Sequence, residues 1–473
     1  MANPKNANGK RTAKGVPPAE RNGAERHVAY FLSLSLENVR CFGPKQTLDL
    51  SDGKGKPAPW TIILGLNGTG KTTVLQLLAG FGPGLEPAST EQTQPARYFH
   101  MTPTEMYAFQ REPRREVASA VVGVTGSSLL ADPPSEEGSY RLTINPEGMV
   151  FRVRLDHVGG LPVRLPWCCG YGASRRVGVA WLGGSGSGSG YYEDIDPTAT
   201  LFVDQAELRN PEEWLLRLDY SAVKPSEDQA QQKARLAQAK ELLLSVLPEG
   251  EIGEIRLVAS GGTNPEPRAE FRTPYGWVPL RQLGYGYQTL ITWVADFVSR
   301  MVERYPESPN PLAEPAVVLV DEIDLHLHPA WQRKIMGFLT ERFPNTQFIA
   351  TAHSPLVAQA AANANLAVLR REGDHVVIDN DVDNIRNWRV DQILTSDLFG
   401  LPTARPPWME PLLAERVKLL SKPKLTAADE RRVKEIEAEI GDAPVGETAA
   451  DIRERKEIRE ALDLLLKERK TAR

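Results

Sequence analysis

Cysteine is scarce in this sequence of 473 residues, which contains only Cys41, Cys168 and Cys169. Three cysteines cannot build a disulfide framework, and two adjacent cysteines lack the spacing of metal ligands. We therefore expect three reduced thiols in a cytoplasmic protein.

Long apolar runs and a strong net charge are also missing. No apolar stretch approaches the roughly 18 residues needed to span a bilayer. Residues 1–27 contain no apolar stretch, which argues against a secretory signal, and their composition predicts a disordered basic tail. That tail either is simply solvated or touches nucleic acid. The net charge of −5 excludes a uniformly cationic surface and leaves a local basic patch possible.

The remaining composition, 41% hydrophobic and 25% charged, is that of a soluble globular protein with two or three cores. Its patterning predicts an α/β fold with a long insertion and a charged helical extension. Alternating residues at 30–36 and 47–50 predict a hairpin, residues 81–140 show little clear periodicity, and residues 211–247 are expected to be helical.

The extension is expected to contain helices at 409–420, 427–440 and 449–470, with a capping box formed by Thr426 and Asp429. It either packs on the core as a solvated helical pair or is an arm that docks a partner or dimerises. The expected segments are a tail (1–27), the N-terminal half of the α/β core (28–80), an insertion of mixed strands and helices that adds to the core sheet and forms a helical lobe, with a flexible loop at 183–190 (81–279), the C-terminal half of the core (280–405) and the extension (406–473).

A glycine-rich loop follows a short apolar run at 60–64 and precedes a predicted helix at 72–78. It matches the pattern G-x-x-x-x-G-K-[ST], in which backbone N–H groups and a helix N-terminus surround phosphate oxygens. Lys71 is expected to reach the β- and γ-phosphates of ATP, and the Thr72 hydroxyl to bind Mg²⁺. The predicted nucleotide-binding residues are Gly65, Asn67, Gly68, Gly70, Lys71, Thr72 and Thr73.

An apolar strand at 316–320 ends in two carboxylates, Asp321 and Glu322. Ligands of open α/β sheets bind at the carboxyl ends of the strands, so this pair is predicted to complete the site. Asp321 would hold Mg²⁺ through water, and Glu322 would orient and polarise the attacking water. The alternative is an ordinary surface turn.

His353 ends the next predicted strand, at 347–351. Since a strand–helix–strand order implies a parallel pair, the imidazole should lie near the γ-phosphate, where it could bond that group. The alternative is a purely structural histidine. His326 and His328 with Asp324 suggest either a metal site or packing at the entry of a helix predicted at 329–343.

The turn Leu283-Gly284-Tyr285-Gly286-Tyr287-Gln288 precedes a predicted helix at 290–302. Tight turns before helices are common, so this one gains meaning from its position upstream of the Asp-Glu strand.

The order of these motifs, with Leu36–Phe42 as a first strand pair, resembles the ABC ATPases of the SMC/RecF-like branch over roughly residues 30–405. It is most similar to the stand-alone ATPases of bacterial defence islands, such as PtuA of Septu systems and the retron-linked ATPases. The supporting segments are Gly170–Arg175, Leu208–Leu216 and Val390–Leu401. The resemblance implies an ABC-type P-loop ATPase sheet flanked by helices.

The resemblance also implies a head-to-tail homodimer or higher oligomer, in which Gly284 and Gly286 of one subunit cap the γ-phosphate held by Lys71 of the other. Asp324 would lie in the loop that links the two sites. The family usually has serine at the position of Gly284, and the hydroxyl of that serine donates to the γ-phosphate. Without this hydroxyl, ATP-driven closure of the dimer is expected to be weaker. Arg175 could contact phosphate or base, or could form a surface or structural ion pair.

By the same resemblance, ATP would switch a dimer that controls a separate effector, possibly an HNH-type nuclease, in antiphage defence. The main alternative is a DNA-binding repair ATPase of the RecF type. A transporter subunit is disfavoured by the long span from Thr72 to Leu283. A fused nuclease is disfavoured because no acidic cluster after His353 suits a metal nuclease.

Overall fold

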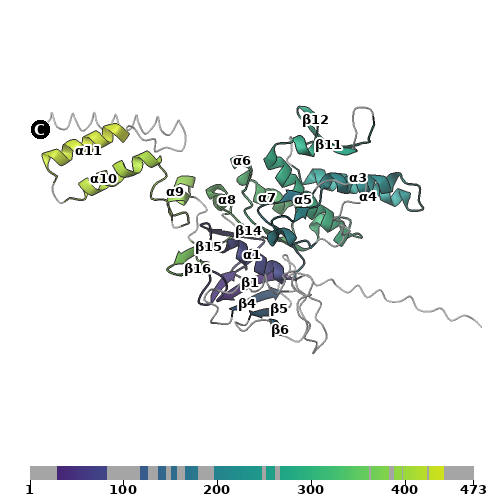
Figure 1. Cartoon of the computed structure of the whole chain (residues 1–473), viewed down its shortest axis with the longest axis horizontal. Coiled ribbons are helices and arrows are strands. Elements are labelled where there is room, and N and C mark those ends of the chain that lie inside the picture. Colours follow the sequence, from purple (N-terminus) through teal and green to yellow (C-terminus); the bar gives the residue numbers. More distant parts are fainter. Residues whose placement is uncertain are drawn as a thin grey trace, which may run out of the picture. The chain divides into compact units, whose positions relative to one another are not determined.

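The computed structural model describes residues 29–81, 118–125, 137–144, 151–156, 166–178, 196–247, 252–261, 267–361, 364–382, 388–396, 398–422 and 425–440 (Figure 1). The chain divides into two compact units, Met1–Asn387 and Trp388–Arg473. The second unit begins inside the segment assigned to the C-terminal half of the core, and the domain limits drawn from the sequence stay predictions. The predicted tail 1–27, the loop 183–190 and a helix expected at 449–470 lie outside the described residues.

A six-stranded sheet forms the centre of the first unit, in the order β16-β15-β3-β14-β13-β7. All neighbours pair in parallel except β15 and β16, which are antiparallel. The three central strands are almost wholly buried because helices cover the sheet, which explains their unbroken apolar sequences. The strands are β3 (Trp60–Gly65), β7 (Cys168–Tyr171), β13 (Ala316–Val320), β14 (Thr346–Thr351), β15 (Asn365–Glu372) and β16 (His375–Asp379).

A second sheet has five antiparallel strands in the order β2-β1-β4-β5-β6. Its first hairpin confirms the prediction made from alternating residues near 30–36 and 47–50. Residues 81–140 show little clear periodicity, yet they contain β4 and the start of β5. The strands are β1 (Tyr30–Glu37), β2 (Gln46–Asp49), β4 (Ala118–Thr125), β5 (Glu137–Ile144) and β6 (Phe151–Asp156).

Helix α1 (Lys71–Gly80) begins directly after the glycine-rich loop, as predicted. Helix α5 (Tyr285–Arg304) begins inside the 283–288 turn, earlier than the predicted start at residue 290. The helix expected over 211–247 is two helices, α3 (Pro211–Val223) and α4 (Gln229–Ser245). Pro225 explains the break, because proline lacks an N–H and disfavours helical geometry in the residue before it. Lys224 is accordingly extended.

The helix expected over 329–343 is also divided, into α6 (Pro329–Gln332) and α7 (Ile335–Arg342). Between them the Lys334 N–H bonds to the carbonyl of Trp331, three residues back, so the helix tightens there. The short helix α8 (Pro355–Ala360) follows β14.

Two small sheets complete the first unit. One contains β10 (Ile255–Val258), β11 (Arg268–Thr273) and β12 (Gly276–Pro279), and the other pairs β8 (Arg176–Val177) with β9 (Glu207–Leu208). Short 3-10 turns lie at Ala199–Leu201, Leu280–Gln282 and Pro311–Ala313.

The second unit contains α9 (Val390–Thr395), the 3-10 turn Pro407–Met409, α10 (Glu410–Leu420) and α11 (Ala427–Ile440). Its capping box is as predicted: the Asp429 N–H donates to the Thr426 hydroxyl, and the Asp429 carboxylate accepts from the Thr426 N–H. Within the described residues, no helix combines the length and the hydrophobicity required to cross a membrane.

Candidate nucleotide-binding site

The glycine-rich loop connects the end of β3 to the start of α1, and its shape depends on Gly70. This residue is left-handed, with a φ of 85°, and a Cβ there would lie 2.5 Å from the Cys41 Sγ. No side chain caps α1. The first N–H groups of the helix therefore face the loop and are available to an anion.

Lys71 is buried, with 6% of its surface exposed. Its Nζ donates to the carbonyls of Gly65 and Leu66, at 2.8 and 2.9 Å. Burial lowers the pKa of Lys71, and the nearby carboxylates of Asp321 and Glu322 oppose that shift. The ammonium is thus held beneath the loop, on the side of the acidic strand.

Asp321 joins the two halves of the sequence. Its carboxylate accepts hydrogen bonds from the Thr72 hydroxyl at 2.7 Å and the Thr351 hydroxyl at 2.6 Å. A carboxylate and a hydroxyl are the hard oxygen ligands that Mg²⁺ prefers, so Thr72 and Asp321 fit this ion.

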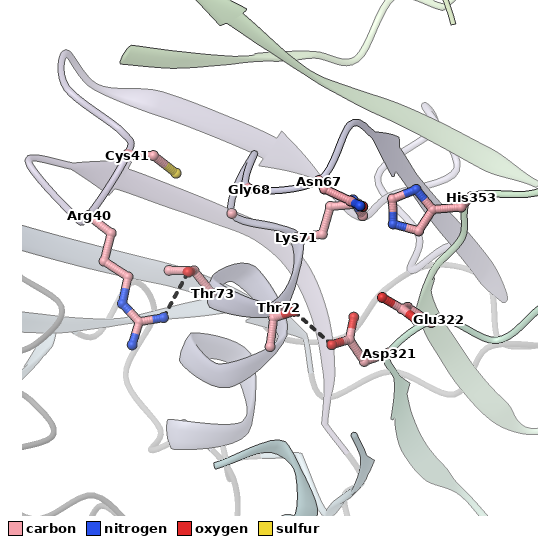
Figure 2. Close-up of a pocket in the computed structure, with 11 residues that line it drawn as sticks. Arg40, Cys41, Asn67, Gly68, Lys71, Thr72, Thr73, Asp321, Glu322 and His353 are labelled. Atoms are coloured by element: carbon pink, nitrogen blue, oxygen red, sulfur yellow. Dashed lines mark hydrogen bonds between the residues drawn. The ribbon is translucent and has the colours of Figure 1, made fainter. Parts of the chain in front are cut away.

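Glu322 and His353 line the pocket on the side away from Arg40 and Cys41 in the view of Figure 2. The main chain of Glu322 is left-handed, with a φ of 49°, and its N–H donates to the Thr351 hydroxyl at 2.7 Å. A non-glycine residue in this conformation is uncommon and often marks a functional site. The N–H of His353 donates to the Asp324 carboxylate at 3.2 Å, so Asp324 anchors the loop that bears the imidazole.

These residues share one pocket of about 440 Å³. Nine predicted site residues line it: Asn67, Gly68, Gly70, Lys71, Thr72, Thr73, Asp321, Glu322 and His353. Gly65 and Asp324 do not line it, but each bonds to a residue that does. The phosphate loop, the acidic pair and the histidine are therefore brought together as predicted.

Arg40 and Cys41 also line the pocket, and they were absent from the predicted site. The Arg40 guanidinium donates to the Thr73 hydroxyl and to the Gln76 side-chain oxygen, both at 3.0 Å. Burial lowers the pKa of Arg40. The available signal was the Leu36–Phe42 segment, which supported the family resemblance without being assigned a role in binding.

Gly284 and Gly286 do not line this pocket. A Cβ on Gly286 would lie 2.4 Å from the carbonyl oxygen of His326, so the start of α5 packs tightly on the loop after Glu322. The Tyr285 ring meets the His326 ring edge-on, with centroids 4.7 Å apart. Their predicted action on a second subunit stays a prediction.

His326 and His328 serve local packing, as the alternative to a metal site predicted. The Nδ1 of His328 accepts from the N–H of Ala330 and caps α6, while His326 contacts Tyr285. Across the described ranges, no group of three or more His, Cys, Asp or Glu side chains could hold a metal ion.

Arg175 does not face the pocket, so a contact with phosphate or base is not its role here. Only 3% of its surface is exposed, and its Nη2 donates to the carbonyls of Asp321 and Glu322. The contacts of Arg175 are therefore structural, but its partners are main-chain carbonyl oxygens and not the carboxylate of an ion pair.

A glycine-rich loop and an Asp-Glu strand joined in one pocket, with a parallel strand between them, define a P-loop NTPase with an ABC-type core. Two sequence families match the chain. Residues 33–82 match an AAA domain, and residues 196–358 match the family described as "AAA domain, putative AbiEii toxin, Type IV TA system".

Curated relatives match over shorter segments. The Septu protein PtuA of Bacillus mycoides (strain KBAB4) is 35% identical over 162 residues, which is 34% of this chain and 22% of the relative. The Retron Ec83 probable ATPase of Escherichia coli is 44% identical over 89 residues, covering 19% of this chain and 16% of the relative. Segments of this chain are therefore similar in sequence to ATPases named from Septu and retron defence systems. The chain spans far less than two thirds of each relative, so their activities as whole proteins enter only as a proposal.

Among solved structures, the SMC head bound to the C-winged helix domain of ScpA overlaps 74% of this chain and 97% of its own, with 16% identity and a TM-score of 0.39. The SMC head domain from Thermotoga maritima gives the same TM-score with 14% identity, over 74% of this chain and 99% of its own. Overlaps this loose support no conclusion, and the fold assignment rests on the sheet order and the pocket.

Proposed function

We propose that this chain binds ATP with Mg²⁺ and hydrolyses it to ADP and phosphate. The observation that carries the proposal is the 2.7 Å hydrogen bond between the Thr72 hydroxyl and the Asp321 carboxylate. It joins a loop suited to a triphosphate and a strand end suited to Mg²⁺ and water, which lie far apart in the sequence.

Each residue would have a distinct task. The loop amides and Lys71 would hold the β- and γ-phosphates, with the Lys71 ammonium leaving the carbonyls of Gly65 and Leu66. Thr72 and Asp321 would hold Mg²⁺, which supplies positive charge to the phosphate oxygens when bound. Glu322 would orient and polarise the attacking water, and His353 would hydrogen-bond the γ-phosphate.

Arg40 adds a cation at the opposite side of the loop from Asp321. Its contacts with Thr73 and Gln76 point the guanidinium along the first turn of α1. A cation there would suit the α-phosphate, which the Lys71 ammonium is not expected to serve.

The active form would be a head-to-tail dimer. The N-terminus of the 20-residue helix α5 has no side-chain cap, and Tyr285 beside it is 61% exposed. An uncapped helix N-terminus of this length suits the γ-phosphate of a nucleotide held by another copy. ATP would join the copies and hydrolysis would release them, giving a two-state switch.

The switch would control a separate effector, and we place it in antiphage defence with a nuclease as the effector. The names of the relatives from Septu and retron systems support this role. A phage-plating assay of cells that carry this gene and its neighbours tests it. Protection should be lost in Lys71→Ala, and equal protection by that variant would contradict the role.

Biochemically, the proposal is tested by a titration of purified protein with a fluorescent ATP analogue, followed by phosphate release. We expect Mg²⁺-dependent binding and turnover in the wild type and in Lys54→Ala, which removes an exposed lysine outside the pocket. Binding that survives in Lys71→Ala would contradict the proposed site.

A further inference from the structure

The loop after β7 lies directly beside the acidic pair. β7 pairs in parallel with β13, and the carbonyl of Tyr171 accepts from the N–H of Asp321 at 2.8 Å. Arg175 follows four residues later, buried and left-handed with a φ of 35°. This geometry turns the side chain of Arg175 back under the end of β13.

The guanidinium of Arg175 binds main-chain oxygens. Its Nη2 donates to the carbonyl of Asp321 and, at 2.6 Å, to the carbonyl of Glu322, while its Nε donates to the carbonyl of Gly172 at 3.2 Å. Hydrogen bonds from an ionised donor are stronger than neutral ones, and a buried cation is retained only where such partners exist. Burial lowers the pKa of Arg175 to about 10, which leaves it charged at neutral pH.

Glu322 is the residue that this contact constrains. Its left-handed main chain is held from both ends: Thr351 accepts from its N–H at 2.7 Å, and Arg175 donates to its carbonyl at 2.6 Å. Its carboxylate lines the pocket. A glutamate with these main-chain angles is unfavourable unless the surroundings impose them, and the angles decide where the carboxylate points.

The loop that carries Arg175 is itself fixed to the rest of the site. The Gly172 N–H donates to the Thr200 hydroxyl at 3.1 Å, and that hydroxyl donates to the carbonyl of Gly170 at 2.9 Å. The next residue, Leu201, accepts at its carbonyl from the Gln76 side chain of α1 at 2.6 Å. Through these hydrogen bonds, Arg175 fixes the position of Glu322 relative to α1, the helix that begins at the glycine-rich loop.

We propose that Arg175 is a positioning residue for hydrolysis: by holding the main chain of Glu322, it aims that carboxylate at the water beside the γ-phosphate. The inference rests on the proposed ATPase function. Arg175 acts through Glu322 and does not touch the nucleotide, so its loss should slow turnover while leaving ATP affinity almost unchanged.

The experiment compares wild type, Arg175→Met, Arg175→Lys and Arg176→Met in the full chain. Arg176 is the exposed neighbour and serves as the matched control. We expect Arg175→Met to lower kcat by about thirtyfold or more, with the Kd of a fluorescent ATP analogue within about threefold of wild type. Arg175→Lys should recover part of kcat, since one ammonium can still reach one carbonyl. Arg176→Met should match wild type.

A double-mutant cycle with Glu322→Gln separates positioning from general damage. If Arg175 works through Glu322, adding Arg175→Met to Glu322→Gln should change the residual rate by less than about twofold. A further fall as large as in the wild-type background would overturn the proposal. Loss of ATP affinity in folded Arg175→Met or Arg175→Lys would also overturn it.

Circular dichroism melting checks the fold of each variant. If Arg175→Met does not fold, Arg175→Lys decides by the same criteria, with unchanged kcat counting against the proposal. If the wild-type protein binds ATP without turnover, the proposed hydrolysis itself is contradicted. That result is distinguishable from a failure of the Arg175 proposal, which requires a wild-type protein that hydrolyses ATP.

Discussion

Two helix N-termini in this protein invite comparison, those of α1 and α5. Neither has a side-chain cap. Around α1, the cation Lys71 is buried and a carboxylate from a distant strand bonds to the first turn. Around α5, Tyr285 is mostly exposed and no residue of the turn lines the pocket. In the proposed function, one chain would thus supply a full phosphate and metal half-site, while the start of α5 contributes no residue to that pocket. The variants below test this difference between the two helix N-termini, from the largest expected effect to the smallest.

Lys71→Ala should have the largest effect, because it removes the cation from the half-site that one chain completes. We expect ATP affinity to fall by a factor on the order of 100 or more, measured by titration calorimetry. Lys54→Ala is the control. ATP affinity close to that of the wild type would show that the nucleotide is held elsewhere.

Glu322→Gln should keep ATP binding and stall turnover, because the amide cannot polarise water as a carboxylate does. We expect a fall in kcat on the order of 100-fold. Since hydrolysis would no longer release the dimer, ATP with Mg²⁺ should trap it in light scattering. A particle that stays monomeric with ATP would count against the dimeric switch.

Gly286→Ala tests the α5 end. Its Cβ would press on the carbonyl of His326, so the start of the helix must shift. We expect roughly a tenfold loss of hydrolysis with ATP affinity within about threefold of wild type. The control is Gly337→Ala, which meets nothing within 4 Å. An equal loss in binding would place Gly286 in the same half-site as Lys71.

Gly284→Ser should have a smaller and opposite effect. The nearest atom to a Cβ there is 3.8 Å away, so the side chain fits, and its hydroxyl could donate to a γ-phosphate. We expect ATP-driven dimerisation to strengthen by a factor of about 3 to 10. Sedimentation at several protein concentrations would measure it, and unchanged or weaker association would argue against this turn facing the phosphate.

Deleting residues 422–473 should change hydrolysis least, by less than about twofold, since the described residues that line the pocket all lie between Arg40 and His353. Docking of an effector should weaken instead. A loss of hydrolysis comparable to that of Lys71→Ala would make the extension part of the catalytic core.

The site could be predicted largely from sequence because its chemistry is local. The spacing of Gly65 to Thr72, the apolar strand before Asp321 and the strand before His353 each carry their own signal, and parallel pairing brings their ends together. Arg40 and Cys41 lie in the Leu36–Phe42 segment and Arg175 in the Gly170–Arg175 segment, which supported the resemblance, but neither segment shows what these side chains contact. Their positions depend on β1 and β7 packing beside strands that are distant in the sequence.

The strands of the insertion were not placed from the sequence. β5 alternates polar and apolar residues from Ser139 to Ile144, which was a visible signal, whereas β4 consists mostly of small and β-branched residues and depends on its pairing with β1 and β5. Helix breaks were underestimated for local reasons. Pro225 was a visible signal for the break after α3, whereas the tightening at Lys334 depends on a single change of hydrogen-bond partner.

The most direct test of the whole account is a structure of Glu322→Gln determined with ATP and Mg²⁺. We predict a triphosphate surrounded by the amides of residues 67–72, with Lys71 on its β- and γ-oxygens and the metal between Thr72 and Asp321. A nucleotide bound away from this loop, or a metal without Asp321 near it, would contradict the account.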